Sequence, residues 1–223
     1  MHFEILVEGQ AELTALSILM SQILGEYNDP HTWKIHKHRG IGRLPDDLSI
    51  SPNEWDRTLL HNLPSKLRAY GNKMGDHEAV VILVDLDDRA DCVAFKNELT
   101  SVLNACENRP KFLVRIAIEE LEAWYFGDKE AIKNACAPFT ESAFEKYTQD
   151  SPCGTWEKLA EVIHPGGIKE LRKHGKRSVR ILEEKRKWAA LIAPKMNVEK
   201  NKSPSFCCFR DGLRRWADPD PNR

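Results

Sequence analysis

The chain of 223 residues is long enough for one domain, or for one domain with a small helical addition. Its 33 Lys and Arg residues nearly balance its 34 Asp and Glu residues, so the formal net charge is -1. This balance excludes a basic coat over the whole protein but leaves room for a local basic patch. No run of 18 apolar residues is present, so we expect no membrane span.

The N-terminus and the cysteines both favour a cytoplasmic protein. Residues 1–7 include Glu4 and lack a basic start followed by a long apolar stretch, so they do not resemble a signal peptide. None of the six cysteines forms a Cys-x-x-Cys pair, and their spacing suits neither zinc nor a disulfide framework. We therefore expect reduced thiols, which are typical of the cytoplasm.

Short apolar runs alternate with amphipathic segments from the N-terminus onward. The run at 3–7 ends in Glu8-Gly9 and is followed by a helical pattern, which predicts a strand, a tight turn and a helix. A turn and a second strand are expected within 28–38, and helical spacing covers 55–70. A basic stretch that contains glycine begins near the end of the second strand and continues as a loop, with His36, His38, Arg39, Gly40, Gly42 and Arg43.

The strongest strand signal is the run AVVILV at 79–84. It is apolar on both faces, as expected of a central parallel strand, and we expect the strand at 3–7 beside it. A helix over 91–106 and a buried strand over 112–118 follow. This alternation predicts an α/β domain with a mostly parallel sheet and helices on both of its faces.

After residue 127 the pattern becomes helical. We expect a first domain at 1–127, a helical C-terminal extension packed on it at 128–217, and a flexible tail at 218–223. The segment 169–187 is strongly basic and is the best candidate to contact a phosphate backbone. Alternatively, it is a solvated helix face whose cations pair with Glu170, Glu183 and Glu184.

Acidic residues follow three of the predicted strands. Glu8 follows the first, Asp85 and Asp87 end the central one, and a cluster at 119–122 follows the last. Ligands of open α/β sheets bind at the carboxyl ends of the strands, so these acids should meet at one edge. Carboxylates so close together repel one another unless a cation neutralises them, which predicts a site for Mg²⁺ or Mn²⁺.

The spacing of these acids agrees with a metal site. Glu8 and Glu12 lie four residues apart and share one face at the start of the first helix. Asp85 and Asp87 alternate with Leu86, so in an extended chain they point the same way. The alternative for Glu12 is a simple capping role at the helix N-terminus.

The segment VEGQAE at 7–12, together with VDLD at 84–87, resembles the Toprim fold of primases, topoisomerases and OLD-type nucleases. The segment EELEAWY at 119–125 resembles a narrower group, the RloB-like and related prokaryotic Toprim proteins. The segment at 36–40 is also similar to that group, and the likeness covers 3–127.

This resemblance implies a metal-dependent nuclease or phosphoryl-transfer site. It implies that Glu8 is a general acid/base or a metal ligand, and that Glu122 is the acid of the last strand. OLD-type nucleases also use a late lysine, for which Lys185 and Lys187 are candidates, with Lys185 preferred. The expected metal ligands are Glu8, Glu12, Asp85, Asp87 and Glu122, which would be enough for two metals.

The expected function is therefore phosphodiester hydrolysis of nucleic acid, most simply DNA, in prokaryotic defence against phage or other foreign DNA. The chain has no P-loop motif, and related Toprim proteins often work beside a separate ATPase, so the resemblance implies a separate ATPase as a partner. The alternatives are a non-catalytic subunit that binds nucleic acid or nucleotides, and a metal-dependent phosphatase. The residues expected to hold nucleic acid are Arg39, Arg43, Lys173, Lys176 and Arg177.

Overall fold

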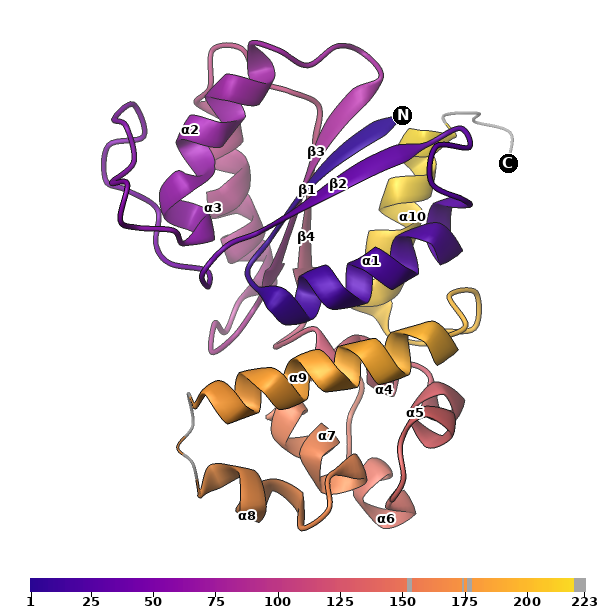
Figure 1. Cartoon of the computed structure of the whole chain (residues 1–223). Coiled ribbons are helices and arrows are strands. Elements are labelled where there is room, and N and C mark those ends of the chain that lie inside the picture. Colours follow the sequence, from indigo (N-terminus) through magenta and orange to yellow (C-terminus); the bar gives the residue numbers. More distant parts are fainter. Residues whose placement is uncertain (152–153, 174, 176–177, 219–223) are drawn as a thin grey trace.

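The computed structural model describes residues 1–151, 154–173, 175 and 178–218. Its centre is a four-stranded sheet in which every neighbouring pair is parallel, in the order β2-β1-β3-β4 (Figure 1). The strands are β1 (His2–Val7), β2 (Thr32–Lys37), β3 (Glu78–Asp85) and β4 (Phe112–Ala117). The predicted α/β fold is confirmed, with β3 in the interior of the sheet and β1 beside it.

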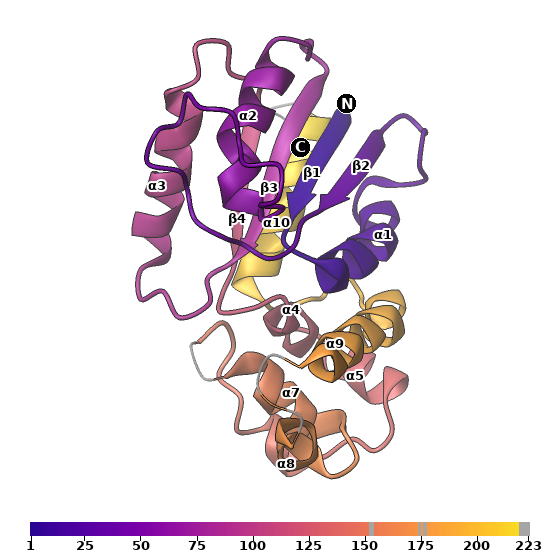
Figure 2. The same cartoon turned by 60° about the vertical axis from the view of Figure 1, so that its left-hand side comes forward.

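Apolar side chains lie on both faces of the sheet and form two apolar layers. On β3, Val81 faces one layer and Ile82 faces the other, because successive side chains of a strand point to opposite faces. Figures 1 and 2 show the helices that cover these faces: α1 (Gln10–Leu24) and α10 (Pro204–Ala217) on one side, α2 (Leu59–Gly71) and α3 (Cys92–Asn104) on the other. This explains why the run at 79–84 has no polar face.

The helix predicted over 55–70 begins later, at Leu59. The preceding residues form a turn, in which the Asp56 N–H donates to the Asn53 carbonyl at 3.0 Å. The Asp56 carboxylate also accepts from the Thr58 N–H at 2.9 Å. Such local side-chain bonds offer the backbone an alternative to a helix, and they delay its start.

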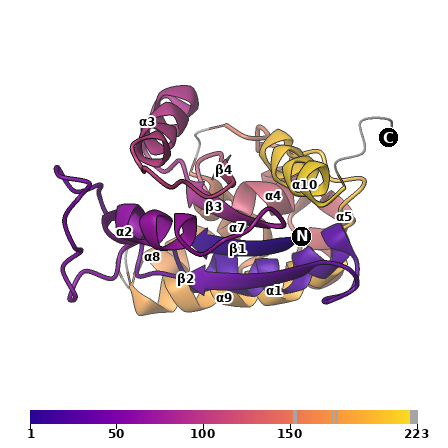
Figure 3. The ribbon, with the colours of Figure 1, turned by 90° about the horizontal axis from the view of Figure 1, so that it is seen from above.

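The remaining helices gather at the carboxyl edge of the sheet, below it in Figure 1. The longest, α9 (Val179–Ile192), packs along α1 (Figure 3). The others are α4 (Glu122–Phe126), α5 (Lys129–Ala135), α6 (Glu141–Phe144), α7 (Thr155–Ile163), α8 (Gly167–Arg172) and a 3-10 turn (Ala193–Lys195).

The last helix, α10, returns to the sheet. It starts after Ser203, whose hydroxyl caps it by accepting from the Phe206 N–H at 3.2 Å. Phe206 joins Ile5 and Trp188 in one apolar core, so this core includes residues on both sides of residue 127. The boundary expected there stays a prediction. Of the tail expected at 218–223, only Asp218 lies within the described residues.

Candidate functional site

Glu8 and Asp85 meet at the carboxyl edge of the sheet. β1 ends at Val7, and the next side chain, Glu8, accepts a hydrogen bond from the Asp85 backbone N–H at 2.8 Å. This bond joins the end of β1 to the end of β3. Two acids that are far apart in the sequence are thus adjacent, as parallel strands with a shared edge require.

Glu12 lies in the first turn of α1 and is buried. Its carboxylate accepts hydrogen bonds from the backbone N–H groups of Gly9 and of Glu12 itself, which lower its pKa, although burial raises that pKa overall. A Cβ atom at Gly9 would lie only 3.2 Å from Glu12 Oε2. Glu12 therefore caps the helix, which is the alternative role considered for it in the sequence. Its carboxylate also lies near the other acids at the carboxyl edge of the sheet, which we call the acidic edge.

Asp87 departs from the expected geometry. The strand ends at Asp85, and Asp87 has a φ of 50°, in the left-handed region. The Asp87 N–H donates to the Glu119 carbonyl at 2.8 Å, which holds the chain in this turn. The prediction that Asp85 and Asp87 point the same way in an extended chain is therefore wrong. Asp87 still contributes electrostatically, because its charge raises the pKa of Glu8.

The acids after β4 divide between two tasks. Glu119 caps α7, because its carboxylate accepts from the Gly154 and Thr155 N–H groups at 2.8 and 2.9 Å. Glu120 accepts from the Trp156 N–H at 3.2 Å and also reaches the acidic edge. Sequence reasoning treated 119–122 as one cluster, and only the fold shows that Glu119 faces α7.

Lys185 of α9 inserts its ammonium group among the acids. Its Nζ lies 3.1 Å from Glu120 Oε1 and 3.3 Å from Glu122 Oε2, and its side chain is only 14% exposed. Lys187, the other candidate, is 63% exposed and pairs with Glu184 at 3.6 Å. The structure thus places Lys185 in the cluster and Lys187 outside it.

Glu122 carries the most unusual environment of the cluster. Its side chain is 1% exposed, Oε2 pairs with the Lys185 ammonium group, and Oε1 has no hydrogen-bond partner within the described part of the chain. The Tyr125 hydroxyl is buried and lacks a partner in the same way. A buried polar group without a partner costs about 1–3 kcal/mol. Such groups in a native fold therefore indicate a bound ion, water or ligand.

The pKa values of the cluster are set by burial. Burial raises the pKa of Glu8 to about 8 and that of Glu120 to about 7. It also raises the pKa of Glu12, Asp85 and Glu122, and repulsion among the carboxylates adds to each rise. For Lys185, burial opposes the charged form, but the surrounding carboxylates raise its pKa well above the usual value. One ammonium group thus interacts with four of these acids, Glu12, Asp85, Glu120 and Glu122.

The side chains of the acidic cluster are of the type that binds a hard divalent cation. They are carboxylates, and Glu122 Oε1 is buried without a partner among the described residues. As the side chains stand, no three His, Cys, Asp or Glu residues in the described ranges have the spacing of a metal-binding set. Lys185 and the backbone N–H groups hold these carboxylates instead. A cation would therefore have to draw them together.

The residues expected to hold nucleic acid lie in two places. Arg39 and Arg43 are exposed in the loop after β2, close to the acidic edge through the Gly40 N–H, which donates to the Glu8 carbonyl at 2.9 Å. Lys173 is exposed and pairs with Glu170 at 2.5 Å, as the solvated-face alternative expects. Lys176 and Arg177 lie outside the described residues.

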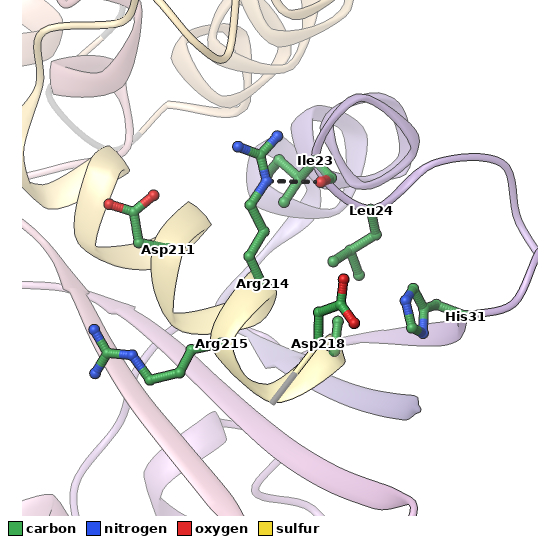
Figure 4. A pocket seen from close by; sticks show the side chains of 8 residues that line it. Ile23, Leu24, His31, Asp211, Arg214, Arg215 and Asp218 are labelled. Carbon is green, nitrogen blue, oxygen red and sulfur yellow. Dashed lines mark hydrogen bonds between the residues drawn. The ribbon is translucent and has the colours of Figure 1, made fainter. Parts of the chain in front are cut away.

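A pocket of about 550 Å³ lies elsewhere, between the last turn of α1 and α10 (Figure 4). In it the Arg214 side chain donates to the Ile23 carbonyl at 3.0 Å and also pairs with Glu199. The acidic edge is at the other end of α1, about 20 Å away at 1.5 Å per residue. This pocket is therefore separate from the acidic cluster.

None of the described helices has the length and apolar character needed to cross a bilayer. Searches of curated proteins and of solved structures find no match to the chain. Residues 7–214 match the family model of a domain of unknown function, DUF4276. Because this match spans most of the sequence, the chain belongs to the DUF4276 family.

Proposed function

We propose that this protein is a metal-dependent nuclease that hydrolyses phosphodiester bonds at the carboxyl edge of its sheet. The observation that carries the proposal is the buried Glu122 carboxylate, whose Oε2 pairs with Lys185 and whose Oε1 has no hydrogen-bond partner in the described structure, beside other acids of raised pKa. Such perturbed groups, gathered from several elements, are typical of catalytic sites.

The acids divide by position. Glu8, Asp85 and Glu122 would hold Mg²⁺ or Mn²⁺, with Glu12 and Asp87 at the border of the site. The bound cation would neutralise charge on the phosphate and lower the pKa of a water molecule. Glu8 has a pKa of about 8 and is suited to take or return a proton near neutral pH. Lys185 would stabilise the negative charge that develops on the phosphate oxygens.

The wider assignment is part of the same proposal. The substrate would be DNA, and the protein would act in prokaryotic defence in the cytoplasm beside a separate ATPase subunit. The resemblance of the segments at 7–12 and 84–87 to Toprim nucleases supports this assignment. The non-catalytic alternative draws support from the capping roles of Glu12 and Glu119, which give these acids a structural purpose.

Cleavage of supercoiled plasmid by the purified full chain would test the proposal. We expect nicking with Mg²⁺ or Mn²⁺ and none with EDTA. Glu8→Gln should abolish cleavage while binding to DNA persists. Lys187→Met serves as the control for Lys185→Met, since only Lys185 enters the cluster. Full nuclease activity in Glu8→Gln would refute the catalytic assignment. Binding without cleavage by the unmodified chain would favour the non-catalytic alternative.

Metal binding has its own test, which does not depend on cleavage. Mg²⁺ or Mn²⁺ should raise the melting temperature of the native chain, because a ligand that binds only the folded state stabilises it. The double variant Asp85→Asn with Asp87→Asn should lose this response. Equal metal-induced shifts in the native chain and the variant would contradict the assignment of these ligands.

A further inference from the structure

A second pocket, of about 590 Å³, lies where β2 ends and the following loop crosses α2. We call it the basic pocket. Its lining is cationic or neutral and includes no Asp or Glu: His36, Lys37, His38, Arg39, Arg57, Asn62 and Lys66. Its character is therefore opposite to that of the acidic cluster.

Three cations in the basic pocket are unpaired. Within the described parts of the chain, Arg39, Arg57 and Lys66 form no ion pair, and no hydrogen bond of their side chains is present. Lys66 is half-buried, and burial lowers its pKa while the charge of Glu4 raises it. Glu4 is itself held by His36 and by the Tyr70 hydroxyl. Cations that converge on a cavity without a counter-ion favour an anionic ligand.

The walls of the basic pocket are fixed by backbone hydrogen bonds. The His38 N–H and its Nδ1 both donate to the Val7 carbonyl, at 3.0 and 2.8 Å. The Arg39 N–H donates to the Arg57 carbonyl at 2.9 Å, which joins the loop to the segment before α2. A site whose groups are already in place loses little entropy when its ligand binds.

The same backbone connects the basic pocket to the acidic cluster. Val7 accepts from His38, and the next carbonyl, that of Glu8, accepts from the Gly40 N–H at 2.9 Å. His38, which lines the basic pocket, is therefore bonded to the residue that immediately precedes Glu8. An anionic strand could bind there with one phosphate while a neighbouring phosphodiester lies at the acids.

We propose that the basic pocket binds one phosphate group of a nucleic-acid strand and so anchors the strand beside the acidic cluster. The identification of the strand as the ligand rests on the proposed nuclease function, while the affinity for phosphate does not. Arg39 and Arg57 supply planar guanidinium groups that can bind two phosphate oxygens, and Lys66 supplies a half-buried point charge in the pocket lining.

Binding measured in EDTA tests this proposal without any cleavage. The probe is a short, fluorescent single-stranded DNA without terminal phosphates, titrated at several salt concentrations. Lys66→Met and the double variant Arg39→Gln with Arg57→Gln should each weaken binding about tenfold or more, as expected for lost charge-assisted contacts. The log–log salt slope should fall by about 0.7 for the lost phosphate contact.

Lys73→Met is the matched control. Lys73 is an exposed cation just after α2 and does not line the basic pocket, so its loss should change affinity by no more than about twofold. Pocket variants that bind like Lys73→Met would overturn the proposal. Because Arg39 and Arg57 are exposed, we expect their double variant to fold, and it tests the proposal even where Lys66→Met does not fold.

Further measurements distinguish a nucleic-acid strand from free phosphate as the ligand, and distinguish the anchoring role from the nuclease function. Inorganic phosphate and a mononucleotide are titrated in parallel by calorimetry. Pocket-dependent binding of these alone, without binding of the oligonucleotide, would overturn the assignment to a strand. Pocket-dependent oligonucleotide binding by a chain that cleaves nothing with Mn²⁺ would support the anchor and refute the nuclease. If the pocket variants cleave limiting substrate as fast as the native chain, the anchoring role of the pocket would be refuted, while the proposed nuclease function would stand.

Discussion

Replacement of Glu8 by glutamine should change how the stability of the protein depends on pH. Burial raises the pKa of Glu8 from its usual value of 4.5 to about 8. A carboxyl group with a higher pKa in the folded chain binds its proton more tightly there, so the free energy of unfolding falls as pH rises from about 4.5 to about 8. The amide side chain of Glu8→Gln has no titratable proton, and its oxygen can still accept from the Asp85 N–H.

The size of the effect follows from the shift itself. A rise from 4.5 to about 8, at about 1.4 kcal/mol for each tenfold change in proton affinity, corresponds to about 5 kcal/mol. Part of this is shared with Glu12 and Asp87, whose charges raise the same pKa, so we expect a difference of about 2–5 kcal/mol. For a chain of this length that corresponds to a rise in melting temperature of roughly 5–15 °C above pH 8.

Urea denaturation in EDTA at a series of pH values measures this difference. Glu8→Gln and the native chain should have similar stability near pH 4.5, and the variant should be increasingly more stable up to about pH 8. Glu98→Gln, at an exposed position of α3, should follow the native curve throughout. If the stability of Glu8→Gln and that of the native chain change with pH in the same way, burial does not raise the pKa of Glu8 as described.

Two further substitutions test how the cluster and the fold are held. Lys185→Met should lower the free energy of unfolding at pH 8 by about 3 kcal/mol, because it leaves buried carboxylates without their counter-ion, whereas exposed Lys187→Met should change it by less than about 0.5 kcal/mol. Gly71→Ala should lower the free energy of unfolding by about 3 kcal/mol in the same urea assay, because its Cβ would lie 1.5 Å from the Asn108 carbonyl oxygen. Gly75→Ala should lower it far less, because the nearest atom to its Cβ would be 3.9 Å away. Equal losses within either pair would contradict the packing described.

The fold followed from the sequence because its signals are local. Apolar runs that alternate with helical spacing predict parallel strands and crossover helices, and these predictions need only neighbouring residues. The run at 79–84 has no polar face because both layers cover β3, and this placed it in the interior of the sheet. The approach of Glu8 to Asp85 followed in turn, since parallel strands share one carboxyl edge.

What lies around that edge depended on the tertiary structure. The left-handed turn at Asp87 is held by a hydrogen bond to Glu119, which follows β4 and lies outside the pattern at 84–87. Lys185 and Lys187 are both candidates in the sequence, and the packing of α9 along α1 buries the first and exposes the second. The basic pocket likewise combines the loop after β2 with Lys66 of α2. Sequence periodicity records which face of an element is apolar, whereas contacts between distant elements are decided by how those faces pack.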